Sequence, residues 1–371
     1  MTWPPWDPEQ PFQGLRLLPP GIELETKEVL KACITARAAL AELRQAVRLI
    51  PHQNILISTL LLLEAQASSE IENIVTTADK LFRSLPNSSA ADPYTREALR
   101  YREALLAGFV DLAHRPLGTR TAETIASRIR DVTMRVRNQE EVSIVNHRTG
   151  QTIYTPPRGE QLLRDLLRNW EQFMHEGTDE LDPLVKMAVA HYQFEAIHPF
   201  TDGNGRTGRI LNTLYLIEQG LLSAPVLYLS RYINQRRSDY YRLLLAVTAE
   251  AAWESWVLYL VDAVAETASW TLAKIAAVRT LMETVRDHFR HELPQIFRQD
   301  LLDLIFEWPY IRIANIVDQG LAVRQTASRY LQELTRIGVL EEISSGREKL
   351  FVNTRLLELL TSESNNFKPF T

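Results

Sequence analysis

The chain has 371 residues, 45% of them hydrophobic and 23% charged, which is the composition of a soluble globular protein with two or three structural units. Its net charge of −5 disfavours a generally basic nucleic-acid-binding protein, although it allows a local basic patch. No apolar run approaches the roughly 20 residues of a membrane span, the N-terminus has no signal-peptide pattern, and the single cysteine, Cys33, cannot form an intrachain disulfide. We therefore expect a cytoplasmic protein that does not enter a membrane.

The N-terminal quarter is predicted to combine an extended arm with helices. Residues 1–20 contain Pro residues throughout, so we expect an extended segment held in place by its aromatic side chains. Apolar residues at alternating three- and four-residue spacing predict an amphipathic helix over 29–47, which ends near Pro51. A leucine-rich helix is expected over 55–72, followed by a short segment over 76–83.

The middle of the chain is predicted to be helical with one β-hairpin. Two short β-prone runs flank a turn cluster at 146–150, which favours a hairpin. A helix that begins near Ser230 and a long apolar-periodic stretch that reaches about His291 are expected downstream. The other predicted helices are 93–114, 119–136, 160–175 and 183–197.

A central loop over residues 197–209 joins two of these periodic segments. It contains a His-Pro pair at His198, an acidic residue at Asp202, two glycines around an asparagine, and arginines at 206 and 209. Glycines let the backbone approach a ligand closely, and the N–H groups that enter the next helix form an anion-binding site. The pattern therefore predicts a polyphosphate site with a base and a metal ligand beside it.

Every fixed position from His198 to Arg209 matches the motif H-P-F-x-[D/E]-G-N-G-R-x-x-R, and the chain thereby resembles the Fic family (filamentation induced by cAMP). The resemblance covers roughly residues 95–290. It implies a mainly α fold with a Fic-type helical core and a β-hairpin flap. We accordingly divide the chain into an N-terminal region with an inhibitory helix, a Fic catalytic core and a C-terminal winged-helix domain, at 1–92, 93–295 and 296–371.

Fic proteins typically transfer AMP from ATP to a Ser, Thr or Tyr hydroxyl of a target protein, so the resemblance implies a protein adenylyltransferase. It assigns His198 as the base that removes the hydroxyl proton. It assigns Asp202 to Mg²⁺, a hard cation suited to carboxylate and phosphate oxygens. The residues implied to bind ATP are Gly203, Asn204, Gly205, Arg206, Thr207, Gly208, Arg209, Tyr240 and Tyr241.

The β-hairpin resembles the flap of the family, which aligns a target segment by strand pairing. The resemblance implies that Ile153, Tyr154 and Thr155 contact the target. Tyr240 and Tyr241 resemble the tyrosines that flank the nucleotide in Fic proteins.

A second motif, Ser68-x-x-x-Glu72-Asn73, resembles the inhibitory helix of the family, [S/T]-x-x-x-E-[G/N]. The resemblance implies that Glu72 pairs with Arg209, the group that should hold the γ-phosphate. ATP would then bind with its α-phosphate misaligned, and a misplacement of about 1 Å can cost about a hundredfold in rate. In some relatives this glutamate also supports removal of AMP from the modified target, which we keep as a second activity.

The region from 296 onwards is predicted to hold helices over 301–306, 312–319 and 323–337 followed by a β-hairpin, which is the winged-helix pattern. Polar and basic side chains occupy the third helix and the wing, where such domains meet DNA. The alternative is a protein–protein or dimerisation module, because acidic residues share the region. The residues concerned are Arg324, Gln325, Thr326, Ser328, Arg329, Arg347 and Lys349 against Glu333, Glu341 and Glu342.

Two alternative functions stay open. Within enzymes, the family also includes transfer of phosphocholine and phosphoryl groups, but the two intact arginines favour a full triphosphate and hence AMP transfer. Outside enzymes, the chain could be a transcriptional regulator whose nucleotide site only senses its ligand, although such a sensor does not need a base at His198. The target protein is unidentified and could be the chain itself, and a homodimer is a further expectation.

Overall fold

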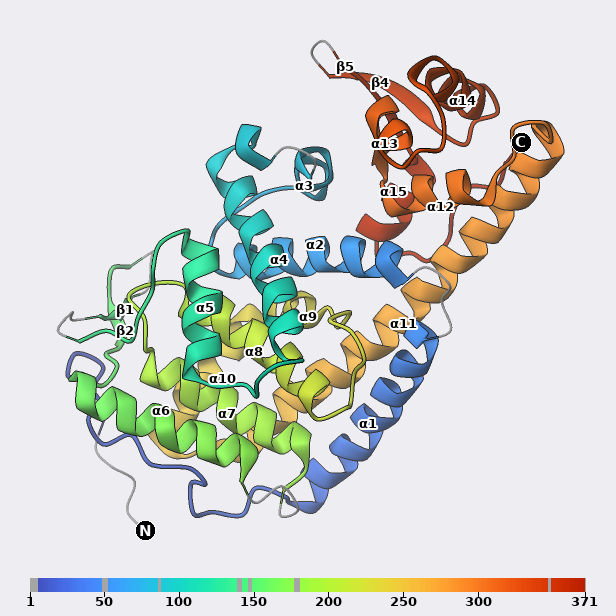
Figure 1. Cartoon of the computed structure of the whole chain (residues 1–371). Coiled ribbons are helices and arrows are strands. Elements are labelled where there is room, and N and C mark those ends of the chain that lie inside the picture. Colours follow the sequence, from blue (N-terminus) through green and yellow to red (C-terminus); the bar gives the residue numbers. More distant parts are fainter. Residues whose placement is uncertain are drawn as a thin grey trace.

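The computed structural model describes residues 6–370 except 49–52, 86–87, 139–141, 146–148, 177–180 and 346–347. The described chain is mainly helical, and its strands form one two-stranded and one three-stranded sheet (Figure 1). Within these residues, no helix combines the length and the apolar character needed to cross a membrane. The predicted mainly α fold is therefore confirmed.

The secondary structure comprises many short helices and one very long one. In the N-terminal half the elements are α1 Lys27–Arg48, α2 Gln53–Ile71, α3 Ala78–Ser84, α4 Pro93–Asp111, α5 Thr119–Arg130, β1 Ile144–Val145, β2 Thr152–Tyr154 and α6 Glu160–His175. In the C-terminal half they are α7 Pro183–Ile197, α8 Asn204–Glu218, α9 Leu229–Gln235, α10 Arg237–Glu250, α11 Trp253–Glu292, α12 Gln299–Glu307, β3 Tyr310–Ile311, α13 Ile313–Asp318, α14 Arg324–Arg336, β4 Glu341–Ser345, β5 Glu348–Val352 and α15 Thr354–Thr361.

Helix α7 is the centre of the core. Every residue from Leu184 to Ile197 is buried, which is the property of a helix packed on all sides. It contacts α6, α8 and α11, so its C-terminal end is fixed from several directions. Asp182 begins the helix by accepting a hydrogen bond from the backbone N–H of Leu184 at 2.8 Å, with Pro183 at the first turn.

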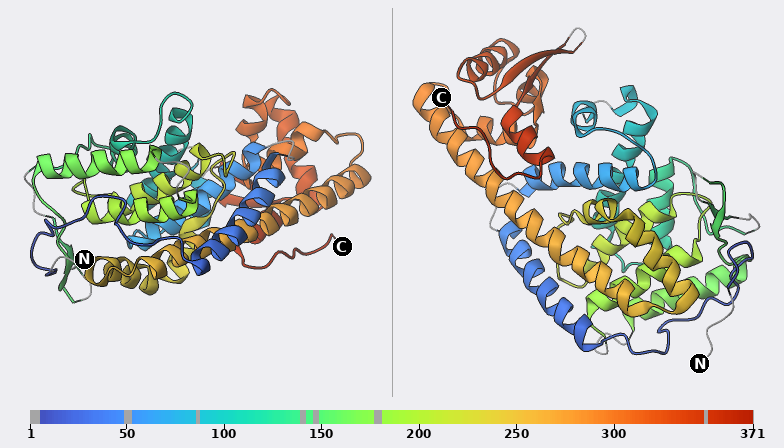
Figure 2. Two further views of the ribbon diagram at one scale, coloured as in Figure 1. Left: turned by 90° about the horizontal axis from the view of Figure 1, so that it is seen from below. Right: turned by 180° about the vertical axis from the view of Figure 1, so that it is seen from behind.

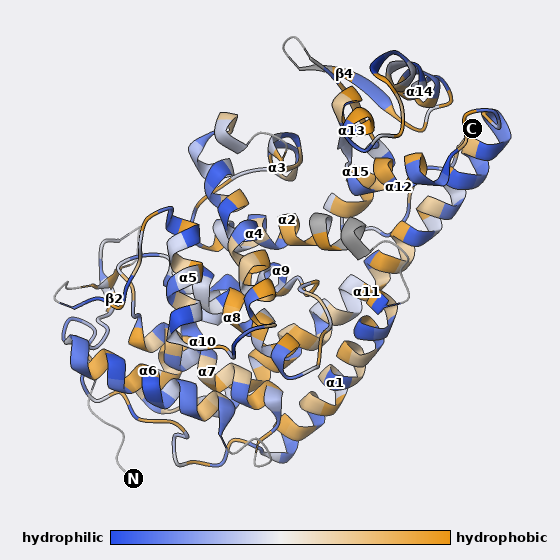
Figure 3. Cartoon of the chain, in the orientation of Figure 1, coloured by the Kyte–Doolittle hydropathy of each residue, from blue (hydrophilic) through white to orange (hydrophobic). Residues whose placement is uncertain are grey.

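Helices α1 and α11 form one wall of the molecule and run side by side over much of their length (Figures 1 and 2). Apolar residues of α1 are buried against this neighbour, whereas much of its outer face is hydrophilic (Figure 3). The buried residues are Val29, Cys33, Ala36, Leu40, Leu43 and Val47, the stripe predicted from the sequence. Thus, the amphipathic pattern of α1 is explained by its packing on α11.

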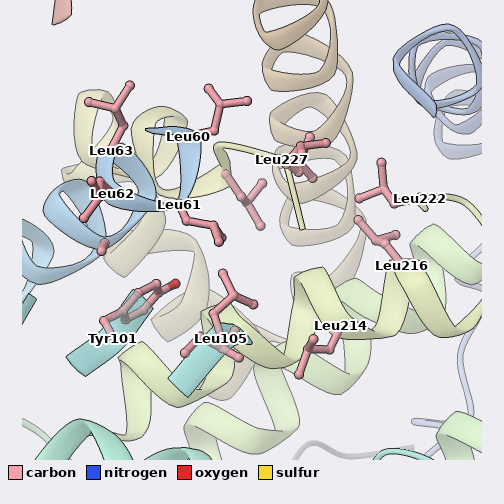
Figure 4. Packing of buried hydrophobic residues seen from close by; sticks show 14 of the residues in the cluster. Leu60, Leu61, Leu62, Leu63, Tyr101, Leu105, Leu214, Leu216, Leu222 and Leu227 are labelled. Atoms are coloured by element: carbon pink, nitrogen blue, oxygen red, sulfur yellow. The ribbon is translucent and has the colours of Figure 1, made fainter. Parts of the chain in front are cut away.

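Helix α2 crosses the molecule between the α4–α8 layer and the C-terminal elements α12–α15 (Figure 1). Its leucines, from Leu60 to Leu63, are all buried, and Figure 4 shows them in the same packed region as Tyr101, Leu105 and Leu214 from α4 and α8. A helix with apolar residues on several faces must pack on several neighbours, and α2 does so.

The β-hairpin lies at the edge of the core and is tied to the N-terminal arm. Strands β1 and β2 pair antiparallel, with Ile144 opposite Tyr154. The Phe12 N–H donates to the Thr155 carbonyl at 3.0 Å, and the Thr155 hydroxyl donates to the Pro8 carbonyl at 2.6 Å. The expected extended arm is therefore present from residue 6 onwards and packs against the segment that follows β2.

The C-terminal elements follow the order helix, strand, helix, helix, strand, strand, helix, and their sheet has the order β3-β5-β4. This order includes the helices and hairpin expected of a winged helix. The unit contacts the N-terminal region: the Tyr310 hydroxyl donates to Asp79, and Arg312 donates to the Arg83 carbonyl at 3.2 Å. On α11, buried Lys274 donates to three carbonyls at the end of α15 and beyond, those of Leu359, Ser362 and Ser364.

Some sequence predictions of secondary structure were wrong in detail. The helix predicted over 119–136 ends at Arg130, because Asp131 adopts a left-handed conformation with φ 57°. The chain then folds back, and the Met134 N–H donates to the Ser127 hydroxyl at 2.9 Å. The helix expected from Ser230 is divided at Arg236. Strand β3 and helix α15 were not predicted, and the expected turn at 146–150 lies partly outside the described residues.

Candidate active site

The candidate site lies where α7 ends and α8 begins. His198 caps α7 in a left-handed conformation with φ 49°, and its N–H donates to the Phe194 carbonyl at 3.0 Å. The proline that follows prevents the helix from continuing. Gly203, with φ 80°, precedes α8 and supplies a backbone conformation that side chains disfavour. The loop therefore places the imidazole of His198 beside the positively polarised N-terminus of α8.

Asn204 holds this loop closed. Its side-chain carbonyl accepts from the Phe200 N–H at 2.9 Å, and its side-chain amide donates to the Phe200 carbonyl at 2.8 Å. The sequence predicts that Asn204 binds ATP. In the structure both polar atoms of its side chain are bonded to the Phe200 backbone, so the side chain holds the loop. The backbone N–H groups at the start of α8 are the part of this segment suited to phosphate.

Arg209 is buried, with 1% of its side chain exposed, and it donates hydrogen bonds to Ser68 of α2 and to Glu72, which follows that helix. Its Nη2 donates to Glu72 Oε1 at 2.9 Å, and its Nε donates to the Ser68 hydroxyl at 2.8 Å. Nη2 also donates to the Ser68 carbonyl at 2.9 Å. The contact between Glu72 and Arg209 that the second motif implies is therefore present.

The environment of Glu72 keeps this pair ionised. Burial opposes ionisation, but the adjacent Arg209 guanidinium outweighs it and lowers the pKa of the Glu72 carboxyl. Asn73, with φ 61°, ends the helix in a left-handed conformation, and Arg237 donates to its side chain at 3.1 Å. The whole Ser68–Asn73 segment is thus fixed against the core.

Arg206 belongs to a second charged cluster. Its Nη1 donates to Glu97 of α4 at 2.6 Å, and its Nη2 lies 3.6 Å from Asp202. Arg130 of α5 joins the same two carboxylates at 2.8 and 3.2 Å. Sequence analysis missed Glu97 and Arg130, because both lie on helices distant in the chain and match no motif. The cluster holds the buried Arg206 guanidinium between Glu97 and Asp202.

Asp202 is the predicted Mg²⁺ ligand, and 52% of its side chain is exposed. Within the described part of the chain, no group of three or more His, Cys, Asp or Glu side chains is arranged to hold a metal. A single accessible carboxylate fits Mg²⁺, which is commonly held by one or two carboxylates together with substrate phosphates and water. The residues present are therefore compatible with a metal that arrives with a nucleotide.

The imidazole of His198 is neutral at physiological pH. Burial, followed by the charge of Arg137, lowers its pKa to about 4, and the nearby carboxylates of Glu72 and Asp202 offset this only in part. A neutral imidazole has a free lone pair and can accept a proton. The electrostatics are therefore those of a base that is ready before its substrate binds.

A buried pair, His191 and Glu195, lies one helical turn apart on α7 behind Gly208. A Cβ at Gly208 would come within 2.3 Å of the Glu195 carboxyl, so only glycine fits there. Burial raises the pKa of Glu195 to about 8, and burial lowers that of His191 to about 3. Spacing of four residues on a core helix was the only sequence signal for this pair.

Tyr240 and Tyr241 have different environments, although both were implied to flank a nucleotide. The Tyr240 ring is buried, and its hydroxyl is 2.9 Å from His191 Nε2. Tyr241 is 40% exposed and packs edge-on against Tyr240. Only Tyr241 is accessible to a ligand in this conformation.

The flap residues also divide into buried and accessible ones. Tyr154 is buried, and its hydroxyl donates to the Ala196 carbonyl at 2.9 Å. Thr155 is buried and bonded to the N-terminal arm. Ile153 is half-buried and is the residue of the three that is open to a partner.

Glu64 is a buried residue of α2 that holds this helix against its neighbours. Sequence analysis did not predict this role. Its carboxylate accepts hydrogen bonds from the Tyr101 hydroxyl at 3.0 Å, from the Ser230 N–H at 2.9 Å and from the Ser230 hydroxyl. It lies one helical turn before Ser68 on α2, and Glu72 follows directly after the end of that helix. These three hydrogen bonds fix the position of α2 relative to α4 and α9, because a buried carboxylate needs its donors.

Comparison with known proteins identifies the class. Three family models match consecutive parts of the chain: the Fic/DOC family N-terminal model over 30–110, the Fic/DOC family model over 112–216, and the C-terminal domain of SoFic-like protein adenylyltransferases over 281–356. Together these models cover most of the 371 residues. The chain belongs to the Fic/DOC family.

Individual relatives resemble shorter stretches. The chain is 36% identical over 93 residues to protein adenylyltransferase fic-1 of Caenorhabditis briggsae, an alignment that covers 24% of this chain and 17% of that protein. It is 46% identical over 76 residues to a probable protein adenylyltransferase of Aquifex aeolicus, covering 20% and 22%. The matched region thus spans about a fifth of the curated relatives.

Solved structures share the fold over longer stretches. A crystal structure of a Fic family protein from Desulfovibrio desulfuricans G20 aligns with a TM-score of 0.55 and 20% identity, covering 89% of this chain and 97% of that one. Fic-1 from Caenorhabditis elegans aligns with a TM-score of 0.51 and 18% identity, covering 68% and 73%. The predicted Fic-type fold is confirmed by these similarities.

The raised pKa of Glu195 predicts a pH-dependent loss of stability. Between pH 4.5, the ordinary value, and pH 8, the carboxyl ionises in the unfolded chain but stays protonated in the folded one, so folding becomes less favourable as pH rises. Glu195→Gln removes this titration while keeping the shape. The thermal unfolding midpoint of the variant should therefore rise relative to wild type as the pH is raised from 5 to 8.

Glu42→Gln on the exposed face of α1 is the matched control and should leave the pH dependence unchanged. A difference between Glu195→Gln and wild type that stays constant from pH 5 to 8 would contradict the assignment.

Proposed function

We propose that the chain is a protein adenylyltransferase that transfers AMP from ATP to a Ser, Thr or Tyr hydroxyl of a protein target, and that Glu72 restrains this reaction. One observation carries the proposal: a neutral imidazole, His198, is fixed beside a helix N-terminus that also carries two buried arginines. The curated relatives named above are protein adenylyltransferases, which supports the same activity.

The proposed chemical step uses His198 as a general base. The target hydroxyl loses its proton to the imidazole as its oxygen attacks the α-phosphorus of ATP, and the bond from that phosphorus to the pyrophosphate oxygen breaks. A hydroxyl is a weak nucleophile near neutral pH, so a positioned base contributes substantially. Since the pKa of His198 is about 4, the imidazole is in its proton-accepting form before the step.

Phosphate binding is assigned to the start of α8. Its first N–H groups, those of Gly203 to Arg206, would face the phosphates, because the first turn of a helix leaves its donors unpaired, whereas the Thr207 N–H already donates to the Gly203 carbonyl at 3.0 Å. The Gly205 backbone can approach a ligand closely, since a Cβ there would lie 2.5 Å from Glu72. Arg206 would hold the β-phosphate from an orientation that Glu97 sets.

We assign Mg²⁺ to Asp202 together with the nucleotide phosphates. The metal would neutralise phosphate charge when bound. The Asp202 carboxylate is held in the loop before α8 by its contacts with Arg130 and Arg206.

Inhibition by Glu72 follows from competition for Arg209. Three hydrogen bonds from the Nε and Nη2 of this guanidinium go to Ser68 and Glu72, so these donors are already engaged and are not available to a γ-phosphate. ATP bound without that contact would be misaligned, and misalignment of about 1 Å can cost about a hundredfold in rate. The same carboxylate is close enough to the site to orient water for removal of AMP, which we propose as a second activity.

The target side is assigned to the flap. Ile153 and the free backbone edge of β2 would pair with an extended segment of the target, which includes the chain itself as a candidate. A cytoplasmic location and a homodimer stay predictions from the sequence.

DNA binding through the C-terminal unit is a separate proposal. Arg324, Gln325 and Arg329 are exposed on α14, which takes the place of a recognition helix. On the hairpin, Lys349 lies 2.7 Å from Glu342 and is partly neutralised, and Arg347 lies outside the described residues. The alternative remains a protein–protein or dimerisation contact.

His198→Ala should abolish AMP incorporation, because no other side chain at the α7 end takes the proton. Incorporation is measured with ATP labelled on the α-phosphate, in a Glu72→Gly background so that the reaction is not restrained. The neighbouring variant His191→Gln tests whether any buried histidine matters, and it should keep measurable activity. Full incorporation by His198→Ala would remove the assignment of the base.

Glu72→Gly should raise incorporation by about tenfold to a hundredfold, because it frees Arg209 for the γ-phosphate. Intact mass measurement after incubation with ATP and Mg²⁺ should show the mass of added adenylyl groups. Glu70→Gly, two residues earlier and exposed at the end of α2, is the control and should not activate. An unchanged or lower rate in Glu72→Gly would refute inhibition by this residue, and addition of a different group would refute AMP transfer.

The full chain should retard genomic DNA fragments in a gel-shift assay if α14 contacts DNA, and added salt should weaken the complex. The double variant Arg324→Ala/Arg329→Ala should bind more weakly, whereas Arg286→Ala on α11 should not. Absence of any salt-sensitive shift with the wild type would leave the protein–protein role.

A further inference from the structure

Arg137 is a buried arginine that the proposed mechanism does not yet use. It follows the turn after α5, in the segment that leads to β1, and 5% of its surface is exposed. Its Nε donates to the His198 carbonyl at 2.8 Å, and its Nη2 donates to the Ile197 carbonyl at 3.2 Å. Its own backbone N–H donates to the Pro199 carbonyl at 2.9 Å. One residue therefore binds the carbonyls of three consecutive residues around the candidate base.

The same guanidinium also reaches the base of the flap. Nη2 donates to the Pro157 carbonyl at 2.5 Å, three residues beyond the end of β2. The flap has a second tie to α7, because the Tyr154 hydroxyl donates to the Ala196 carbonyl. Arg137 is thus the group that joins the flap to the backbone of His198 itself.

This arrangement needs an arginine. The carbonyls of Ile197 and His198 lie at the end of α7, where a helix has no partners of its own for them, and a cation is favourable there. His198 also has positive φ, a conformation that persists only when its surroundings hold it. A planar guanidinium offers five donors spread over three nitrogens in fixed directions, whereas a lysine ammonium donates from a single nitrogen and does not reproduce the separate Nε and Nη2 contacts made here.

We propose that Arg137 is a positioning residue, which fixes the imidazole of His198 against the phosphate site and makes its orientation depend on the flap to which the target docks. This inference rests on the proposed function, because it assumes that His198 is the base. It assigns Arg137 an effect on the rate of transfer rather than on the binding of ATP.

The charge of Arg137 adds a second, measurable consequence. The groups that act on the imidazole are Arg137, the backbone of Glu195, Glu72 from the turn after α2, and Asp202 from the loop. Burial lowers the pKa of His198 most, and Arg137 lowers it further, while the other three raise it. Replacing Arg137 by a neutral residue should therefore raise the pKa of His198, and replacing it by lysine should not.

The experiment compares Arg137→Lys and Arg137→Gln in the Glu72→Gly background, with Arg135→Gln as the control. Arg135 lies two residues away, is largely exposed and pairs with Glu123. From initial rates of AMP incorporation between pH 3.5 and 9, we expect both Arg137 variants to lose about tenfold to a hundredfold in kcat. KM for ATP should stay within about twofold of the background, since phosphate binding by α8 is untouched.

The two variants should differ in their pH profiles. The fall in kcat at low pH reports protonation of His198. In Arg137→Gln this fall, the acid limb of the profile, should move to higher pH, whereas in Arg137→Lys it should stay in place. Retention of kcat by Arg137→Lys, or an unmoved acid limb in Arg137→Gln, would overturn the proposal. A loss that appears wholly in KM would also overturn it, because it would show a defect of binding.

A titration by NMR separates this inference from the proposed function. The imidazole of His198 is followed in wild type and in Arg137→Gln, without any substrate, and its pKa should be higher in the variant. Equal values would overturn the coupling whatever reaction the protein performs. Conversely, if His198→Ala kept its activity, the proposed function would fail while this titration still reported on Arg137.

Discussion

The guanidinium of Arg209 is almost completely buried, and a buried charge must keep an ionised, hydrogen-bonded partner. This requirement links α2 to α8, because Ser68 and Glu72 supply the partner in the present conformation. A polyphosphate could supply it equally well. Two anions, one from the chain and one from a nucleotide, would therefore compete for a single cation, and the balance between them would set the activity.

The packing of α2 restricts how that competition can be resolved. Glu64 accepts hydrogen bonds from Tyr101 and Ser230, and the leucines between α2 and α4 are buried (Figure 4). Moving the whole helix would leave a carboxylate buried without its donors, which is costly. Rotation of the Glu72 side chain breaks far fewer contacts. The geometry therefore favours a local change at the end of α2 over displacement of the element.

Much of the site could be predicted from sequence because its main parts lie in one contiguous segment, from His198 to Arg209, which comprises the loop after α7 and the first turns of α8. The contact of Glu72 with Arg209 was also predicted, because a short motif marked it. The roles of Glu97 and Arg130 could not be, since their contacts join residues far apart in the chain. Tyr154 shows the converse limit: the family resemblance implied a target contact, but neither the resemblance nor the alternation of a short hairpin says which side chains face the core.

Helix α11 has 40 residues and is therefore about 60 Å long. It packs against α1 and α7 at one end and against α12 and α15 towards the other (Figures 1 and 2). An uninterrupted rod that is shared by two bodies transmits displacement without a hinge. A partner that displaces the C-terminal unit would therefore also tilt α11. Because α11 packs on α1 and α7, that displacement would reach the helices that support the loop of His198.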